Sequence, residues 1–238
     1  MITLTDRVVL FDIDGTLISS YKSERDERLR YVDAIRDVTG KIPIVNPSRF
    51  AGMVDPQICR IILTETGISE PELENVLPRV LSRMALAYCR TRKEVILNRG
   101  VKDLLELLHY STEHVVGTVT GNIRTIAVKK LNAAGIARYF KEGFYADNYL
   151  DRNRLVGDAV RSCVSKYSLT STEDVIIVGD TPLDVKAASA AHATSIGVAS
   201  GVYSTKVLAT SGATYTFQDL TLTDDVLASL SIDTSRIG

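Results

Sequence analysis

The sequence has few cysteines, and the three that it has, Cys59, Cys89 and Cys163, lie far apart. None belongs to a CxxC pair, so neither a disulfide framework nor a zinc site is indicated. Because no cysteine pattern points to an oxidising compartment, we expect a reduced, cytoplasmic protein.

The sequence also lacks long apolar runs and an excess of charge of either sign. No stretch approaches the roughly 18–20 apolar residues that span a bilayer. Acidic residues interrupt the short apolar run near the N-terminus, which is unlike a signal peptide. Lysine and arginine (28) nearly balance aspartate and glutamate (29), for a net charge of −1. We therefore expect no nucleic-acid partner and no membrane partner.

What the sequence does contain is an alternation of strand and helix patterns. Apolar runs typical of buried parallel strands are Val8–Ile13, Val115–Thr118, Val175–Val178 and Thr194–Val198, with shorter candidates at Gly143–Tyr145 and Thr214–Phe217. Helical patterns are Val101–His109, Ile123–Ala134, Asn153–Tyr167 and Asp184–Ala191. The alternation predicts an α/β fold with a Rossmann-like, doubly wound parallel sheet that helices cover on both faces.

Residues 19–95 break this alternation, because they hold helical patterns and no convincing strand. The patterns are Glu24–Thr39, Pro56–Thr66 and a third that runs from a capping box at Ser69 towards Arg92. Pro78 is expected to kink or split the third helix. We therefore expect an α-helical domain of residues 19–95, inserted into an α/β core of residues 1–18 and 96–238.

Polar residues follow three of the predicted strands, at the edge where open α/β sheets bind their ligands. The segments are Asp12-Ile13-Asp14-Gly15-Thr16, Thr120-Gly121-Asn122 and Gly179-Asp180-Thr181-Pro182-Leu183-Asp184. Carboxylates about 4 Å apart repel by about 4 kcal/mol at an effective dielectric constant near 20, so such a cluster needs a cation or a proton. An all-oxygen cluster of Asp12, Asp14, Asp180 and Asp184 suits Mg²⁺, although Asp184 is alternatively a helix-cap acid.

An anion site is expected beside this cation site. Thr120 and the backbone N–H groups of Gly121 and Asn122 offer donors at the start of a helix, although Asn122 is alternatively only an N-cap residue. A cation site next to an anion site indicates an enzyme that acts on phosphates.

The two opening aspartates can divide the chemistry of such an enzyme. Asp12 would attack phosphorus as a nucleophile. Asp14 would protonate the leaving oxygen and later deprotonate water, which requires that neighbouring negative charge raise its pKa. Gly15 lets the chain turn away, and Thr16 would bind the phosphate or close that turn.

DIDGTL after an apolar strand, a threonine after the next strand and the later GDTPLD together resemble the haloacid dehalogenase superfamily. TGN and the helical insert resemble its phosphoglycolate-phosphatase-like branch, in which the insert is a cap domain of the C1 type. The resemblance implies a central first strand, Asp12 as nucleophile, Asp14 as acid and base, and Thr120 as a phosphate ligand. It also implies Mg²⁺ on Asp12, the Asp14 carbonyl and Asp180.

The chain departs from the family pattern at its third motif, which is normally a lysine. No lysine lies between Asp147 and Ser162, but DRNRLVGDAV offers Arg152 and Arg154. Arginine can bind phosphate and neutralise the nucleophile, though with a geometry different from that of lysine. We favour Arg152, because a helix beginning near Asn153 would hold it at the mouth of the sheet.

A loop of the insert, Phe50–Gln57, resembles the family's cap loop. Gly52, Met53 and Asp55 are therefore substrate-contact candidates, or else parts of a plain interdomain loop. The lysine pair Lys129-Lys130 and the charge run Lys22–Arg30 are expected to face solvent, at least in part.

Taken together, these features predict a Mg²⁺-dependent phosphatase that hydrolyses a small phosphate monoester through an aspartyl-phosphate. Its partner would be a small phosphorylated metabolite, and the chain would be a monomer or a homodimer. The alternatives are a phosphomutase resembling β-phosphoglucomutase and a non-catalytic module that binds phosphometabolites.

Overall fold

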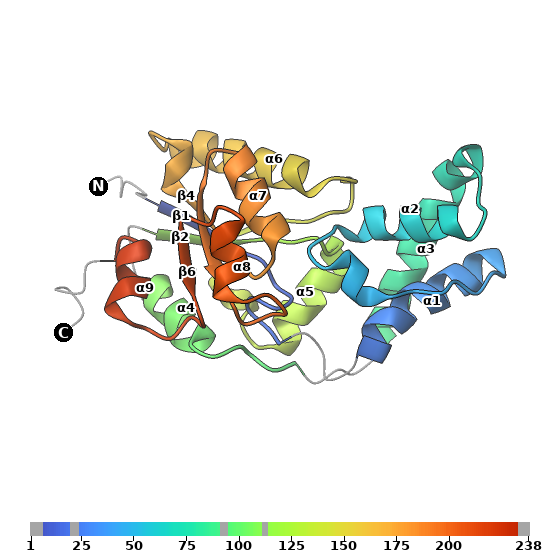
Figure 1. The fold of residues 1–238 in the computed structure, drawn as a ribbon, viewed down its shortest axis with the longest axis horizontal. Coiled ribbons are helices and arrows are strands. Elements are labelled where there is room, and N and C mark those ends of the chain that lie inside the picture. The colour runs from blue at the N-terminus through green and yellow to red at the C-terminus, as the bar shows by residue number, and fades with distance from the viewer. Residues whose placement is uncertain (1–6, 20–23, 91–94, 111–113, 233–238) are drawn as a thin grey trace.

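A computed structural model describes residues 7–19, 24–90, 95–110 and 114–232. Six parallel strands form one sheet in the order β3-β2-β1-β4-β5-β6 (Figure 1). The strands are β1 (Arg7–Phe11), β2 (His114–Val119), β3 (Glu142–Phe144), β4 (Val175–Gly179), β5 (Thr194–Val198) and β6 (Tyr215–Phe217). The predicted α/β fold is confirmed, and β1 lies centrally between β2 and β4.

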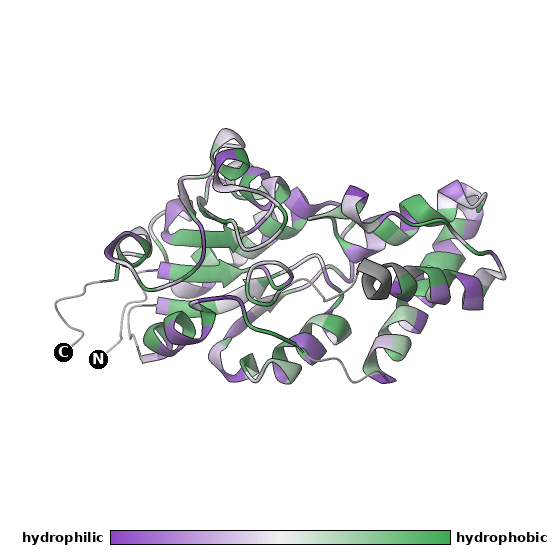
Figure 2. Cartoon of the chain, turned by 60° about the horizontal axis from the view of Figure 1, so that its bottom comes forward, coloured by the Kyte–Doolittle hydropathy of each residue, from purple (hydrophilic) through white to green (hydrophobic). Residues whose placement is uncertain are grey.

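Helices cover both faces of the sheet, as the near-continuous apolar strands require. Val9 and Phe11 of β1 pack with α4 (Val101–Tyr110), α5 (Arg124–Ala133) and α9 (Asp224–Ser229). Val8 and Leu10 face the opposite way and pack with α6 (Arg152–Tyr167) and α7 (Pro182–Ala190). Successive side chains of a strand point to opposite faces, so one short strand contributes to two cores. In Figure 2 the strands are correspondingly hydrophobic along most of their length.

The remaining covering elements are short. They are α8 (Thr205–Thr210) and the 3₁₀ helices η2 (Ala137–Tyr139) and η3 (Thr172–Asp174). Helices α8 and α9 were not among the predicted elements.

Three helices form a separate part at the end of the molecule away from both chain termini (Figure 1). They are α1 (Glu24–Thr39), α2 (Asp55–Glu65) and α3 (Glu70–Arg90), with the 3₁₀ helix η1 (Pro47–Phe50) between α1 and α2. Their shared hydrophobic core also takes in Ile123 and Ile126, beside and within α5. Helix α5 therefore packs against the sheet on one side and against the helical part on the other.

Helix α3 runs without interruption through Pro78, so this proline does not split the helix, and the alternative that it kinks the helix stays a prediction. At its start, Glu72 accepts hydrogen bonds from the backbone N–H (2.9 Å) and the hydroxyl (2.6 Å) of Ser69, and the first of these is one of the two bonds of the predicted capping box. The predicted continuation to Arg92 lies outside the described residues. Within the described part of the chain, no helix is both long and apolar enough to cross a bilayer.

Candidate active site

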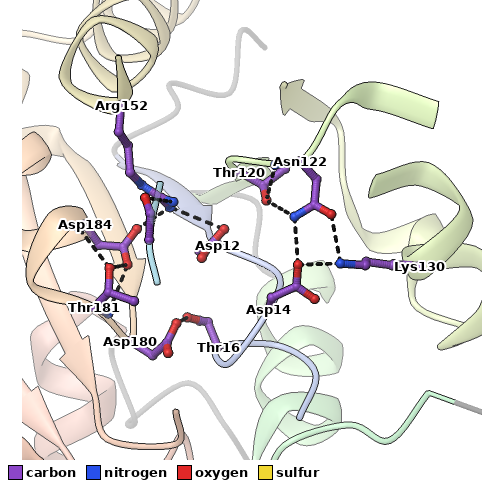
Figure 3. A network of polar contacts seen from close by, with 11 residues as sticks. Asp12, Asp14, Thr16, Thr120, Asn122, Lys130, Arg152, Asp180, Thr181 and Asp184 are labelled. Carbon is purple, nitrogen blue, oxygen red and sulfur yellow. Dashed lines mark hydrogen bonds and ion pairs between the residues drawn. The ribbon is translucent and has the colours of Figure 1, made fainter. Parts of the chain in front are cut away.

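The loops that follow β1, β2 and β4 meet at one edge of the sheet, as predicted, and bring their polar side chains together (Figure 3). Asp12 lies in the middle of this group. Figure 3 shows Arg152, Asp180 and Asp184 on one side of it and Asp14, Asn122 and Lys130 on the other. We call these two sets the acidic half and the paired half of the site, and we count Asp12 in the acidic half.

The acidic half holds three buried carboxylates. Asp12, Asp180 and Asp184 each offer an oxygen atom, and these oxygens all lie within 4.8 Å of one another. Burial, more than any neighbour, raises the pKa of Asp12 to about 6, with Arg152 opposing the shift and Asp184 and Asp14 adding to it. Burial and the negative charges of Asp184 and Asp12 raise the pKa of Asp180 well above its usual value.

These carboxylates fit a divalent cation. A buried, all-oxygen cluster whose members repel one another is stabilised by positive charge, and Mg²⁺ prefers such oxygen ligands.

Two glycines leave space for the carboxylate of Asp180. A Cβ atom on Gly15, which has a φ of +83°, would lie 2.2 Å from Asp180 Oδ2, and one on Gly201 would lie 1.8 Å from it. Only glycine at both positions lets the carboxylate sit there.

Arg152 is the cation of the acidic half. The first residue of α6, it is buried, and its guanidinium forms ion pairs with Asp12 (3.3 Å) and with Asp184. The neighbouring candidate, Arg154, lies on the exposed side of the same helix, and its backbone N–H binds the N-cap residue Asp151. The structure thus brings Arg152 into the acidic half and leaves Arg154 outside it.

Asp184 is the capping acid of α7, one of the two roles that its sequence position allowed, and its role as a cation ligand stays a prediction. One oxygen, Oδ2, accepts hydrogen bonds from the backbone N–H (3.0 Å) and the hydroxyl (2.7 Å) of Thr181, in a capping box that begins α7. The other oxygen faces Arg152 and the carboxylate cluster. Thr16, a candidate phosphate ligand, donates its hydroxyl to Asp180 (3.1 Å).

The paired half is electrically balanced. Asp14 Oδ2 accepts hydrogen bonds from Lys130 Nζ and from Asn122 Nδ2 (2.7 Å), and Lys130 Nζ also donates to Asn122 Oδ1 (2.8 Å). Burial raises the pKa of Asp14, but Lys130, Arg30 and Asn122 together bring it below its usual value. The expectation that neighbouring negative charge raises this pKa is therefore wrong for these surroundings.

One further expectation fails here, and one alternative is excluded. Lys130 does not face solvent even in part, because its side chain is 0% exposed. Asn122 is not an N-cap residue, since Ile123 occupies that position of α5 and Asn122 uses its side chain on Asp14 and Lys130. Thr120, also buried, accepts hydrogen bonds at its hydroxyl oxygen from the backbone N–H (3.3 Å) and the side-chain amide (3.2 Å) of Asn122.

The predicted cap loop reaches the site. The carbonyl of Gly52 accepts a hydrogen bond from Arg152 (2.9 Å), and a Cβ on Gly52 would lie 2.4 Å from the hydroxyl of Thr181. Gly121 meets the same loop, because a Cβ there would lie 2.5 Å from the carbonyl oxygen of Met53. The backbones of the cap loop and the core loops therefore approach closely at Gly52 and Gly121.

Asp55 has its carboxylate engaged by the protein itself. Arg30 (3.0 Å) and Tyr31 (2.8 Å) of α1 bind one oxygen, and the backbone N–H of Ile123 (3.0 Å) binds the other. These contacts join the helical part to the start of α5. Arg30, predicted to lie on a solvated face, is instead largely buried.

Comparisons with known proteins agree with this geometry. Residues 9–198 match the family model of haloacid dehalogenase-like hydrolases. A phosphoglycolate phosphatase of Pseudomonas fluorescens (strain Pf0-1) is 24% identical over 225 residues, which are 90% of this chain and 77% of the relative.

Solved structures show the same fold. A hydrolase from Pseudomonas syringae has a TM-score of 0.69 at 24% identity, with 95% of this chain and 98% of that chain covered. A β-phosphoglucomutase from Clostridium difficile has a TM-score of 0.70 at 14% identity, with 95% and 97% covered.

The chain therefore belongs to the haloacid dehalogenase-like hydrolase family. The family match confirms that the chain belongs to the predicted class of hydrolases, and the relative from Pseudomonas fluorescens is a phosphatase.

Proposed function

We propose that the protein is a divalent-cation-dependent phosphatase that hydrolyses a small phosphate monoester through an aspartyl-phosphate on Asp12. The observation that supports this most directly is the acidic half. Three buried carboxylates lie together there, two of them, Asp12 and Asp184, paired with Arg152, and a second aspartate follows Asp12 two residues along the chain.

Asp12, Asp180 and Asp184 would hold the cation, for which we propose Mg²⁺. A bound cation would neutralise charge on the phosphoryl oxygens and lower the pKa of Asp12, so that the nucleophile is ionised near neutral pH. Asp12 would then attack phosphorus, while Arg152 neutralises charge beside it. Asp14 is ionised in the free chain, because its pKa is lowered, so it would take up a proton as the negatively charged ester binds beside it. It would then give this proton to the leaving oxygen and later take one from the water that hydrolyses the aspartyl-phosphate.

We further propose that residues 19–95 act as a cap over the site, with Gly52 and Met53 on the loop that closes it. Closure of a cap excludes bulk water and favours small substrates over macromolecules.

Among such substrates, phosphoglycolate is the first to test, because the relative from Pseudomonas fluorescens is a phosphoglycolate phosphatase. The cytoplasmic location and the choice between monomer and homodimer stay predictions.

The test is phosphate release from a panel of small esters, with Mg²⁺ or EDTA, by the wild type and by Asp12→Asn. We expect Mg²⁺-dependent release that falls at least about 10⁴-fold in Asp12→Asn, because the uncatalysed reaction is extremely slow. Tight binding of an ester without release would favour a non-catalytic module, and a requirement for a bisphosphate activator would favour a phosphomutase. Release that is unchanged in Asp12→Asn would contradict the proposed nucleophile.

A further inference from the structure

Lys130 is a fully buried lysine that none of the steps above uses. Burying an ammonium group is unfavourable unless the charge is paired and its hydrogen bonds are satisfied. Lys130 reaches from the last turn of α5 to the loop after β1, where its Nζ binds Asp14 Oδ2 and Asn122 Oδ1 (2.8 Å). The buried ammonium group of Lys130 thus lies directly against Asp14, the residue to which we assign proton transfer.

The contacts form a closed ring of three side chains. Asn122 donates through Nδ2 to Asp14 Oδ2 (2.7 Å) and accepts from Lys130 at Oδ1, so Lys130 also fixes the orientation of the amide. Both donors bind the same oxygen of Asp14. The other oxygen, Oδ1, is buried and has no hydrogen-bond partner among the described residues. One oxygen of the carboxylate is therefore anchored, and one is left for a reacting group.

Lys130 itself is held by the helical part as well as by the core. Its Nζ lies 5.8 Å from the centre of the Tyr88 ring, on α3, which is within range of a cation–π contact. Tyr88 is also buried. The position of the ammonium group thus depends on contacts from both parts of the molecule.

We propose that Lys130 is a positioning residue for Asp14. With Asn122 it anchors Oδ2, so that Oδ1 faces the oxygen that leaves phosphorus. In the first step the proton moves from Oδ1 to the leaving oxygen as the P–O bond breaks, and in the second it moves from water to Oδ1. Lys130 keeps its protons throughout. This inference rests on the proposed function, because it assumes that Asp14 transfers the proton.

The test compares two esters in Lys130→Met. An alkyl phosphate such as glycerol phosphate needs a proton on its leaving oxygen, whereas p-nitrophenyl phosphate releases a stable anion without one. The ratio kcat/KM reports the steps up to departure of the leaving group when that departure is irreversible. We expect Lys130→Met to lower kcat/KM about 100-fold for the alkyl ester and less than about 5-fold for the aryl ester, as loss of general acid catalysis does.

Two controls separate positioning from folding. Lys129→Met changes the neighbouring lysine, which is partly exposed and binds the carbonyl of Cys89, and should leave both esters unaffected. In an Asp14→Asn background, Lys130→Met should cause no further loss, because residues that act through one another are not additive. If Lys130→Met fails to fold, Lys130→Gln is used in the same comparison.

Equal losses on both esters, no loss on either, or a full further loss in the Asp14→Asn background would each overturn the positioning role. A wild type that releases phosphate from neither of these esters nor from the panel above would instead overturn the proposed function, and this inference with it.

Discussion

Asp12 and Asp14 are two residues apart on one loop, yet they lie in opposite surroundings. Asp12 belongs to the acidic half, where three carboxylates share one guanidinium, and its pKa is raised to about 6, chiefly by burial. Asp14 belongs to the paired half, where one ammonium and one amide bind one carboxylate. There burial raises the pKa of Asp14, but these donors and Arg30 outweigh it and bring the pKa below its usual value.

The two halves therefore differ in whether they need a bound ligand to balance their charge. The paired half is neutral on its own, and its charges stabilise the folded chain. In the acidic half the carboxylates outnumber the cation, so the fold carries a local cost that a divalent cation would offset. A group of residues whose charge is balanced only when a ligand binds is typical of a functional site and not of residues that stabilise the fold.

The largest effect is expected from removing the only cation that contacts the acidic half among the described residues. Arg152→Met leaves Asp12 and Asp184 buried without their ion-pair partner. Breaking a buried pair from one side costs about 3–5 kcal/mol of unfolding free energy. Urea unfolding in EDTA measures this loss, and Mg²⁺ should restore part of it.

Arg154→Met is the matched control, because Arg154 is exposed and lies on the same turn of α6. It should change the unfolding free energy by less than about 0.5 kcal/mol, as exposed substitutions usually do. Equal losses in the two variants would mean that Arg152 does not balance the acidic half.

A smaller effect is expected from pH in the absence of divalent cations. Since the pKa of Asp12 is about 6 in the folded chain, the folded state holds a proton that the unfolded state has already released between pH about 4 and about 6. The contribution of Asp12 to stability therefore falls by about 1–3 kcal/mol as the pH rises through this window.

Saturating Mg²⁺ should remove this fall, because a ligand that binds the ionised carboxylates stabilises the folded state increasingly as they lose their protons. Unfolding curves of the wild type and Asp12→Asn at pH 4.5 and 7.5, each with and without Mg²⁺, make the comparison. If the two proteins respond identically to pH in EDTA, the acidic half does not hold Asp12 at a raised pKa.

The smallest effect is expected at the capping box that anchors Asp184. Thr181→Ala removes the hydroxyl that binds Asp184 Oδ2 and should cost about 1 kcal/mol of unfolding free energy. It should also weaken Mg²⁺ binding about tenfold, as loss of a group that orients a metal ligand commonly does.

Ser171→Ala removes a similar capping box at η3, away from the site. It should lower stability by a similar amount and leave Mg²⁺ binding, measured by calorimetry, unchanged. A loss of Mg²⁺ affinity in both variants would show that the effect comes from stability alone.

Much of this arrangement was predictable from the sequence, because strand ends in a parallel sheet meet at one edge. The apolar runs located all six strands, and the polar segments after three of them predicted the convergence of Asp12, Thr120 and Asp180. Arg152 followed from its expected place at a helix start.

Lys130 was not predictable by the same reasoning, although a signal was present. The helical period placed Lys130 on one face with Ile126, Ala127 and Leu131, all of which are buried. Lysine usually reaches solvent from such a face, so partial exposure was the natural expectation. Only the tertiary fold shows that the end of β1 lies beside α5 and offers Asp14 as a partner. Asp55 is similar, because its partners lie on α1 and at the start of α5.

The most direct test of the contrast between the two halves is one pair of isosteric substitutions, Asp12→Asn and Asp14→Asn, unfolded by urea at pH 7.5 in EDTA. Asp12→Asn should raise the unfolding free energy by about 1–3 kcal/mol, because it removes an ion whose burial is unfavourable. Asp14→Asn should lower it by about 2–4 kcal/mol, because it leaves the buried Lys130 ammonium without its carboxylate. Shifts of opposite sign would support the account, and shifts of the same sign would contradict it.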